Sequence, residues 1–477
     1  MMKEQEEAAT IRSDLTNWGG KLAFVATMKR FATCWKVGVA WKTLDAPIQW
    51  AQESVILVAF TFTFICALTL LQRSRGFDIA HEQPVGLPPG ARLGEECSPF
   101  SAGVMSDVTI VLKIGAGEAT KRLSDYLAHL SHCKPELLIF SDRQDKQNGM
   151  EIVDVLANLQ PGLTRNNPDF DIYDRIQRTN TTESRSKEGW RLDKYKFLPM
   201  MEWTSYLRPK SQWYVFVELD TYVNYDNLYR FLSTFDPTTA HYFGSPVWPK
   251  KKPAFAHGGS GFVLSRGAMN KLVTHGHKFR GDRRTPGTHF FGQDVEKFCC
   301  GDEVLARVLK QSGVSLRGYW PMFNGEKPST ISFGKDHWCE AVISLHHLND
   351  HDFAKLAEWE SLRTHSGLPL TFKELFTMIE PQLYAGGDSY DWTNVSEDVV
   401  CKKDTVNDCG EACFKDSKCM QFEYMGTECR LGYSIRLGHG QPRKGSQMRT
   451  SSWMVGRIEE FKEAQRCEGA HFLHANP

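Results

Sequence analysis

Residues 211–228 read SQWYVFVELDTYVNYDNL. The run Trp213–Leu219 is apolar and rich in β-prone side chains, which predicts a buried strand. Glu218 and Asp220 stand two residues apart at its end, so both carboxylates point to the same side of an extended strand. Two carboxylates at the carboxyl edge of an α/β sheet suit Mg²⁺ or Mn²⁺ bound jointly with a diphosphate. The alternative is that both acids only cap a solvent-facing turn.

Short β-prone runs and helical patterns alternate around this segment. Such an alternation predicts an α/β domain with a largely parallel sheet, and we place it over residues 96–385. The other strand candidates are Val108–Ile114, Glu136–Phe140 and Ser260–Leu264, and the helical candidates are Leu123–His132 and Asp226–Thr234.

The overall composition is that of a globular protein. The chain has 477 residues, of which 41% are hydrophobic and 24% charged, so a mainly disordered chain is excluded and about two or three domains are expected. Lys and Arg together number 57, as do Asp and Glu, so the chain lacks the basic excess of a general nucleic-acid binder. We therefore expect no nucleic-acid partner.

Residues 54–72, SVILVAFTFTFICALTLLQ, carry no charged side chain and are long enough to cross a bilayer as a helix. They predict a single-pass anchor between a cytosolic tail at 1–53 and a Pro- and Gly-rich stem at 73–95. The alternative is a buried helix. Basic residues flank the span on both sides, so the positive-inside rule leaves its orientation open.

Cysteines and glycosylation sequences place the part after the span in the secretory lumen. Eleven of the thirteen cysteines follow residue 72, which suits an oxidising compartment. The triplets Asn-Thr-Thr at 180–182 and Asn-Val-Ser at 394–396 make Asn180 and Asn394 the predicted glycan acceptors. The sequence thus predicts a type II membrane protein whose large C-terminal part is luminal.

Residues 217–246, VELDTYVNYDNLYRFLSTFDPTTAHYFGSP, resemble the core of the family 31 glycosyltransferases, the family of the core 1 β1,3-galactosyltransferases and of Fringe. That family carries Asp-x-Asp followed by Thr-Tyr-Val, then an Asp-Asn-Leu helix and a Tyr-Phe-Gly strand. The matching segments here are Asp220–Val223, Asp226–Leu228 and Tyr242–Gly244. Glu218 is a departure, because it stands where the family usually has Asp. The resemblance implies a GT-A type nucleotide-sugar-binding domain, Rossmann-like in fold.

A glycine-rich segment follows in the order of the family. HGGSGFVLSRGAM, residues 257–269, resembles the family's Gly-Gly-x-Gly segment. Gly258, Gly259 and Gly261 let the backbone approach a substrate closely, although turns use the same residue type. The resemblance implies that these three glycines form a substrate loop.

An acid stands at the start of the next predicted helix. Apolar residues recur at helical spacing over 304–309, so a helix begins near Asp302. By itself, Asp302 is equally an N-cap or a first-turn acid beside the helix dipole. The resemblance to the family makes it the catalytic base, with Ala306 as a departure from the usual Gly.

The segment WCEAVISLHHLNDHDF, residues 338–353, supplies histidines. The family has a Ser-Phe-His near here, whose His completes the metal site, and His346 occupies that place. His347 and His351 are the alternatives, and a purely structural histidine is the plainer reading. The metal site that the resemblance implies consists of Glu218, Asp220 and His346.

Two residues before the acidic strand are candidate contacts of the nucleotide sugar. Asp142 ends the strand-like run LLIFSD, and the early strands of the family line the nucleotide pocket. Lys194 lies in GWRLDKYKF, a helical pattern that precedes the acidic strand. Both residues are equally open to a structural role. The donor contacts that the resemblance implies are Asp142, Lys194, Glu218 and Asp220.

The resemblance implies transfer of a hexose, with galactose as the default, from a UDP-sugar to a glycan or glycoprotein acceptor through a β1,3 linkage. Mn²⁺ or Mg²⁺ would neutralise the leaving diphosphate, and Asp302 would take the proton of the acceptor hydroxyl. One base without a second nucleophilic carboxylate fits a single displacement with inversion. The family also implies a Golgi membrane location. The rival hypothesis is a non-catalytic adaptor that binds glycan or protein.

Residues 395–470 form a second, cysteine-rich domain. Its cysteine spacing and the text DCGEACFKDSKCMQFEY resemble the PAN/apple module. The pairs implied by that resemblance are Cys413–Cys419, Cys409–Cys429 and Cys401–Cys467. Such modules bind proteins or carbohydrate, so acceptor targeting is one hypothesis and a stabilising appendage is the other.

Five luminal cysteines remain outside that domain, so one of them stays unpaired or links two chains as a homodimer. Cys97–Cys133 is the first candidate pair among them. The other three are Cys299, Cys300 and Cys339.

Overall fold

The computed structural model describes Met105 and residues 107–130, 136–179, 187–250, 252–277, 295–363, 367–443 and 445–475, all within the compact unit Pro84–Pro477. The predicted cytosolic tail, membrane helix and stem, the pair Cys97–Cys133 and the acceptor Asn180 lie outside these residues. In the described part of the chain, no helix is both long enough and apolar enough to span a membrane.

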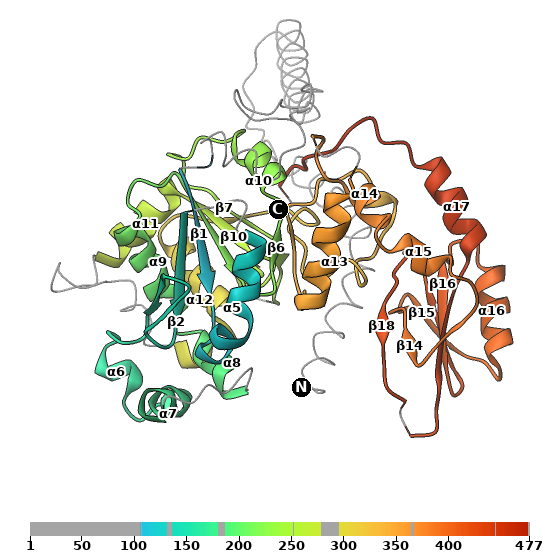
Figure 1. The fold of residues 1–477 in the computed structure, drawn as a ribbon, viewed down its shortest axis with the longest axis horizontal. Helices are drawn as coiled ribbons and strands as arrows, with labels where there is room; N and C mark the ends of the chain where they lie inside the picture. The colour runs from blue at the N-terminus through green and yellow to red at the C-terminus, as the bar shows by residue number, and fades with distance from the viewer. Residues whose placement is uncertain are drawn as a thin grey trace, which may run out of the picture. The chain divides into compact units, whose positions relative to one another are not determined.

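A mixed eight-stranded sheet forms the centre of the α/β part, in the order β11-β7-β10-β5-β1-β2-β4-β3 (Figure 1). β10 runs antiparallel to β5 and β7, and β3 antiparallel to β4, whereas the other neighbours are parallel. The strands are β1 (Val108–Lys113), β2 (Glu136–Ser141), β3 (Asp145–Gln147), β4 (Met150–Asp154), β5 (Trp213–Glu218), β7 (Tyr242–Gly244), β10 (Phe262–Ser265) and β11 (Leu316–Gly318).

The predicted strands exist, but the prediction of a largely parallel sheet is only partly right. Between β7 and β10 the described residues, all but residue 251, form only the small hairpin of β8 (Pro246–Val247) and β9 (Phe255–Ala256). It contains no helix that could carry the chain across the sheet, which a parallel neighbour requires. β10 therefore runs antiparallel to its neighbours. The glycine-rich segment that precedes β10 lies at the edge of the sheet where β5 ends.

The central strands β1 and β5 are apolar along most of their length because both faces of the sheet are covered. Ile110 and Val111, neighbours in β1, belong to different hydrophobic cores on the two faces. The parallel register places Lys113 of β1 opposite Glu218 of β5. Two charged residues thus meet where both strands end.

Helices cover both faces of the sheet. Residues of α5, α10 and α13 join the core that contains Ile110, and residues of α9, α11 and α12 join the core that contains Val111. The helices of this part are α5 (Ala116–Leu130), α6 (Pro161–Thr164), α7 (Asp171–Thr179), α8 (Lys187–Asp193), α9 (Phe197–Leu207), α10 (Tyr225–Leu232), α11 (Arg266–His277), α12 (Gly301–Gln311), α13 (Asp350–Ser361), α14 (Phe372–Phe376) and α15 (Glu380–Leu383).

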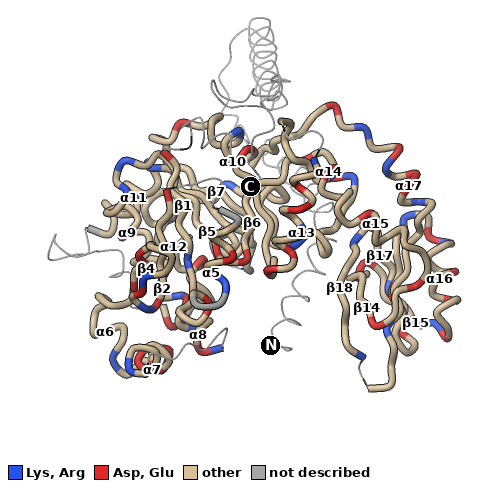
Figure 2. The backbone as a smooth tube through the Cα atoms, viewed as in Figure 1, with Lys and Arg blue, Asp and Glu red and all other residues tan. Residues whose placement is uncertain are grey.

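Both predicted helices exist with shifted ends. The prediction Leu123–His132 covers only the second half of α5. The prediction Asp226–Thr234 corresponds to α10, whose first turn is capped by Asn224, because its side chain accepts a hydrogen bond from the backbone N–H of Asn227. Figure 2 shows Lys and Arg residues interspersed with Asp and Glu residues along the described chain, in keeping with their equal totals.

The C-terminal module, residues 389–475, is built on the five-stranded antiparallel sheet β13-β19-β16-β17-β15. The disulfide Cys409–Cys429 ties α16 to this sheet, and Cys413–Cys419 ties it to the loop before β16; these are the two inner pairs that the resemblance implies. The elements of the module are β13 (Ser389–Tyr390), β14 (Trp392–Thr393), β15 (Val399–Lys402), α16 (Val406–Lys415), β16 (Gln421–Met425), β17 (Glu428–Gly432), β18 (His439–Gly440), β19 (Arg449–Trp453) and α17 (Val455–Ala464).

The third implied pair, Cys401–Cys467, is wrong. Cys467 bonds Cys339 of the α/β part, and Cys401 is a free thiol. After α17 the chain returns to the α/β part, where the backbone N–H of His471 donates to the carbonyl of Cys339 at 2.9 Å. Cys401 lies instead in β15 opposite Cys429, whose sulfur is already in a disulfide.

The C-terminal module shares a hydrophobic core with the α/β part. Ile435 and Ile458 of the module belong to the same buried cluster as Ile110 of β1. Phe333 and Ile435 exchange two backbone hydrogen bonds, of 3.0 and 2.8 Å. The module is therefore built into the α/β part rather than joined to it by a linker alone.

The predicted glycan acceptor Asn394 is also contradicted. Its side chain is fully buried, and Nδ2 donates to the carbonyl oxygens of Phe422 and Ser452 at 3.0 and 3.2 Å. A glycan on Nδ2 would remove these hydrogen bonds and would have no space in the core of the module. Asn394 is therefore a structural residue of this fold.

Candidate active site

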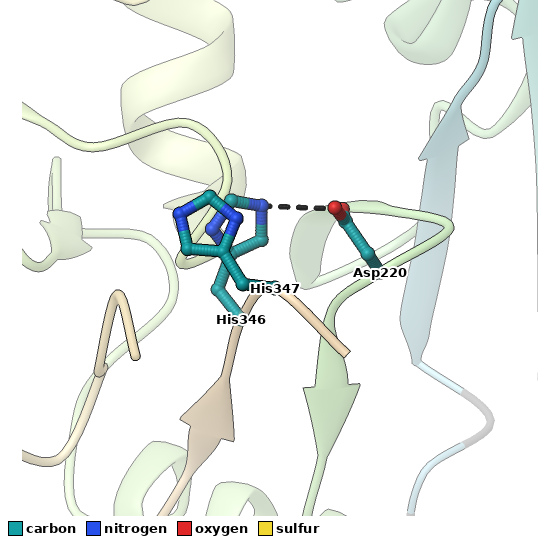
Figure 3. Close-up of side chains that lie close together, drawn as sticks. All are labelled: Asp220, His346 and His347. Carbon is teal, nitrogen blue, oxygen red and sulfur yellow. Dashed lines mark ion pairs between the residues drawn. The ribbon is translucent and has the colours of Figure 1, made fainter. Parts of the chain in front are cut away.

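Asp220 and His346 meet beside the end of β5. β6 (Tyr222–Val223) follows Asp220, β12 (Ser344–Leu345) precedes His346, and the two strands pair antiparallel. This pairing brings Nε2 of His346 to 3.1 Å from Oδ1 of Asp220, as Figure 3 shows. Both side chains are buried. The predicted convergence of these two distant residues is therefore present in the fold.

The imidazole of His346 is suited to a metal ion. Although Nε2 faces Asp220, neither of its buried ring nitrogens makes a hydrogen bond within the described residues. Buried polar atoms without a hydrogen-bond partner are costly and call for a specific explanation. His347 joins the pair, since one potential ligand atom from each of the three residues lies within 4.8 Å of the others. This donor set fits a divalent cation.

The glycine loop determines the position of the His346 ring. A Cβ built on Gly259 would lie 2.8 Å from Nδ1 of His346 and closer still to Cε1 and Nε2, so only glycine leaves room for the ring. The loop is held by side chains on both sides. Thr221 Oγ1 donates to the carbonyl of Gly259 at 2.7 Å, and Ser344 Oγ to that of Ser260 at 2.5 Å.

Asp302 lies in the first turn of α12, on the other side of the same loop. The backbone N–H of Gly258 donates to its Oδ2 at 3.0 Å, and the N–H of Glu303 donates to its Oδ1 at 2.9 Å. Burial, aided by the charge of Glu218, raises the pKa of Asp302 to about 6 against the opposing effect of these N–H groups and of Lys113. A carboxylate with a raised pKa is a competent proton acceptor near neutral pH.

Phe197 holds the start of α12 against the glycine loop. A Cβ on Gly301 would lie 2.7 Å from Cγ of Phe197 and closer to its Cδ2, and a Cβ on Gly258 would lie 3.3 Å from its Cζ. The same ring receives the ammonium group of Lys113 at 5.0 Å from its centre. The two glycines thus let α12 and the loop pack on one aromatic ring, which sets the position of Asp302.

Glu218 does not join Asp220 and His346. Its carboxylate lies 3.1 Å from Nζ of Lys113, and it is not among the residues whose ligand atoms gather within 4.8 Å. The prediction that Glu218 and Asp220 point together assumed a strand that continues to Asp220, whereas β5 ends at Glu218. A turn follows, closed by the hydrogen bond from the N–H of Thr221 to the carbonyl of Glu218 at 3.1 Å, so strand alternation no longer applies.

Two of the four predicted donor contacts, Asp142 and Lys194, have partners within the fold. Asp142 Oδ1 accepts a hydrogen bond of 2.7 Å from the N–H of Ala116 at the start of α5 and lies 3.5 Å from Nζ of the buried Lys196. Lys194 pairs with Asp169 at 2.9 Å. These contacts match the structural role that the sequence left open for both residues.

Lys113 is the residue that sequence reasoning missed. It forms ion pairs with Glu218 and with Asp193 of α8, and its side chain is buried. A signal was available, because Lys113 ends the apolar run VTIVLK just as Glu218 ends WYVFVE. A lone charge at the carboxyl end of a buried strand points to the edge where α/β sheets carry functional groups.

Of the two histidines named as alternatives to His346, only His347 lies in the group. His351 is exposed in the first turn of α13 and is not part of the three-residue cluster. The structure therefore gathers the predicted site residues into two sets. One contains Asp220, His346 and His347, and the other contains Glu218 and Asp302, to which the structure adds Lys113.

Comparisons with known proteins agree with this picture. Residues 165–290 match the profile of the Fringe family, described as Fringe-like. A stretch of 68 residues, 14% of this chain, is 37% identical to the glycoprotein-N-acetylgalactosamine 3-beta-galactosyltransferase 1 of Xenopus laevis and covers 19% of that protein. The chain thus matches about a fifth of the length of this relative. It contains a Fringe-like domain of glycosyltransferase family 31 in the part of the sequence that carries Asp220 and the glycine loop.

Proposed function

We propose that this protein is a metal-dependent, inverting glycosyltransferase with a GT-A type domain. The proposal rests on one arrangement: the Gly258-Gly259 step contacts Asp302 on one side and His346, beside Asp220, on the other. A proton acceptor and a candidate cation site are therefore neighbours on one loop. The Fringe-like domain and the galactosyltransferase relative support the same class of reaction.

In the proposed reaction, Asp302 accepts the proton of the acceptor hydroxyl as that oxygen attacks the anomeric carbon of the donor sugar. The N–H of Gly258 orients the carboxylate, and the pKa of about 6 leaves it ionised at neutral pH. Glu218, the carboxylate whose charge acts on Asp302, is paired with Lys113. With Asp302 as the one assigned base and Glu218 engaged by Lys113, the arrangement supports a single displacement that inverts the anomeric centre.

Asp220 and His346 would hold the divalent cation, Mn²⁺ or Mg²⁺. When bound, such a cation supplies positive charge that neutralises the departing diphosphate. The buried ring nitrogens of His346 without hydrogen-bond partners support this assignment. Contacts of Asp142, Lys194 and Glu218 with the nucleotide sugar stay predictions, because the structure gives each of them a partner within the protein.

The proposed donor is a UDP-hexose, with UDP-galactose as the default, and the acceptor is a glycan or glycoprotein joined through a β1,3 linkage. The relative's name, a 3-beta-galactosyltransferase of glycoprotein N-acetylgalactosamine, supports both choices. The described disulfides support a luminal location in the secretory pathway. A type II anchor in the Golgi membrane and a homodimer complete the proposal from the sequence.

UDP release from a panel of UDP-sugars, measured on the purified protein with Mn²⁺ and glycan acceptors, tests this function. We expect turnover of at least one donor, and its loss in Asp220→Ala and Asp302→Asn. Glu411→Gln, an exposed acid of α16, is the matched control and should keep full activity. Binding of sugars without turnover of any donor would instead favour the non-catalytic adaptor.

A further inference from the structure

We propose that His347 is a third ligand of the cation site, together with Asp220 and His346, and that this set of two imidazoles and one carboxylate prefers Mn²⁺, Co²⁺ or Zn²⁺ to Mg²⁺. This ligand set deepens the proposed function, on which it rests, by naming the residues and the class of metal. It differs from the set implied by the family resemblance, in which a carboxylate at Glu218 takes the third place.

The first support is the position of the two rings. The ring centres of His346 and His347 are 4.0 Å apart, and Figure 3 shows both rings beside the carboxylate of Asp220. One ligand atom from each of the three residues lies within 4.8 Å of the other two. Atoms this close need only small side-chain rotations to reach the bond lengths of about 2.0–2.2 Å that nitrogen and oxygen ligands make with such cations.

The second support is the backbone at His347. Successive residues of a strand point to opposite faces, so His346 and His347 would diverge if β12 continued. Instead, His347 has a φ of 63°, in the left-handed region, which residues other than glycine adopt uncommonly and Asn, Asp and His more often than the rest. The next residue is fixed, because the N–H of Leu348 donates to the carbonyl of Asp220 at 3.2 Å. Strained backbone of this kind is concentrated at functional sites.

The third support is the engagement of Glu218. Its carboxylate is held by Lys113, which itself is fixed between Glu218 and Asp193 and packs on Phe197. Glu218, the acid at the family's metal position, is thus paired with Lys113. His347, next to His346, is the residue that can supply a third ligand beside Asp220. His347 is exposed whereas Asp220 and His346 are buried, so the cluster faces solvent on the side of His347. Catalytic metal sites keep such an open side for the substrate.

The ligand types decide which metal is favoured. Imidazole nitrogen suits Zn²⁺, Co²⁺, Ni²⁺ and Fe²⁺, whereas Mg²⁺ prefers carboxylate and water oxygens in near-ideal octahedral geometry. Affinity for nitrogen-containing sites also rises along the first-row series from Mn²⁺ through Co²⁺ to Cu²⁺ and falls again at Zn²⁺. Replacing one carboxylate by an imidazole therefore lowers the affinity of the site for Mg²⁺ relative to its affinity for Co²⁺ and Zn²⁺.

Metal titrations of the purified full-length protein, without nucleotide sugar, test the ligand set. Co²⁺ binding is followed by its visible spectrum, Mn²⁺ binding by electron paramagnetic resonance, and Mg²⁺ by competition with Mn²⁺. We expect Co²⁺ to bind more tightly than Mg²⁺. His347→Gly should weaken Co²⁺ binding by about tenfold or more and change the visible spectrum, while Mg²⁺ binding changes less. Glycine is chosen because it accepts the positive φ of this position.

Three further variants make the comparison specific. His346→Ala should abolish tight binding of Co²⁺ and should also weaken the binding of Mg²⁺. His351→Ala, which removes an exposed histidine outside the cluster, should bind both metals as the wild type does. Glu218→Gln should also leave Co²⁺ affinity unchanged, because its carboxylate is engaged by Lys113. A wild-type Co²⁺ affinity and spectrum in His347→Gly would overturn the role of His347.

The wild-type protein provides a test that does not depend on a variant folding. Pulsed paramagnetic resonance of the Mn²⁺-loaded protein should resolve nitrogen couplings from two imidazoles. Couplings from one imidazole only would refute the three-residue set. Turnover of UDP-sugars is measured separately, so a protein that binds Co²⁺ through two imidazoles but uses no donor would refute the transferase and keep the ligand set.

Discussion

Gly259 and His346 are in such close contact that the imidazole occupies the space where a side chain at 259 would begin. A Cβ on Gly259 would come within 2.8 Å of Nδ1 and nearer to Cε1 and Nε2 of His346. The two residues are far apart in the sequence, and the contact couples the glycine loop to the candidate cation site. Because Gly258 binds Asp302 in the same loop, the loop also sets the spacing between the proposed base and the proposed metal.

Gly259→Ala should therefore disable the site without unfolding the protein. The new methyl group must displace the His346 ring or the loop, since buried atoms at such distances cannot coexist. We expect Mn²⁺ affinity to fall by about tenfold or more and transferase activity by about 100-fold or more, because small misplacements of catalytic groups have effects of this size. Gly456→Ala in α17, where no atom lies within 4 Å of the added Cβ, is the control and should retain both. Unchanged Mn²⁺ affinity in Gly259→Ala would contradict the coupling.

The pH profile should report the pKa of Asp302. A base must be ionised to accept a proton, so kcat/KM should rise with pH to a plateau above about pH 6, the pKa to which burial and the charge of Glu218 raise this carboxyl group. Glu218→Gln removes one of the charges that raise the pKa, so its acidic limb should move to lower pH. The measurement is kcat/KM for the donor between about pH 4 and about pH 8, a range of about two units on each side of the pKa. A flat profile across pH 6 would exclude Asp302 as the base.

Asp302→Asn should be at least as stable as the wild type at neutral pH. The folded-state pKa of about 6 exceeds the ordinary value of 3.8, so folding favours the protonated form, and this contribution is present below pH 3.8 and lost as the pH rises through 6. The ionised group therefore costs about 1–3 kcal/mol at pH 7. Urea unfolding of both proteins at pH 7 and pH 5 checks this. The advantage of the variant should shrink at the lower pH, and a variant that is less stable at both values would show that the carboxylate stabilises the fold.

The disulfide Cys339–Cys467 should anchor the C-terminal module to the α/β part. It closes a loop with a sequence separation of 128, and loss of such a bond costs about 2–5 kcal/mol. Cys467→Ser and Cys339→Ser should lower the unfolding free energy by similar amounts, and the double variant by no more than either. Cys401→Ser is the control and should be near neutral, because Cys401 is a free thiol. Equal losses in Cys401→Ser and Cys467→Ser would restore the pairing implied by the apple resemblance.

Lys113→Met should destabilise the protein by removing the lysine that pairs with Glu218 and one of the two lysines that pair with Asp193. Lys113 contacts Glu218 and Asp193, and although burial acts to raise the pKa of Asp193, the charges of Lys113 and Lys196 lower it. Breaking a buried ion pair on one side costs about 3–5 kcal/mol. Glu218→Gln added to Lys113→Met should recover part of this loss, because the carboxylate that has lost its lysine is then removed. Thermal unfolding of the single and double variants measures both effects, and a Lys113→Met protein as stable as the wild type would contradict the pairing.

The apolar runs, the glycine-rich segment and the acid before α12 could be recognised in the sequence because each is a local pattern. Strands such as β1 and β5 follow from continuous β-prone residues, and α12 follows from helical spacing after Asp302. The inner disulfides of the C-terminal module were implied by the resemblance to the PAN/apple module, and both are present in the structure. The match of Asp220 with His346 came from motif order in a family, since no local pattern links residues so far apart.

The sequence by itself determined which segments form strands and helices and which side chains could do chemistry. Tertiary structure decided which of them meet. A turn begins at Glu218, where β5 ends, so Asp220 is not part of that strand. The pairing of β6 with β12 places His346 beside Asp220. The chain returns after α17, and Cys467 forms a disulfide with Cys339. The physical reason is that periodicity and turn chemistry act over a few residues, whereas hydrophobic burial is non-directional and fixes distant neighbours only when the whole core packs.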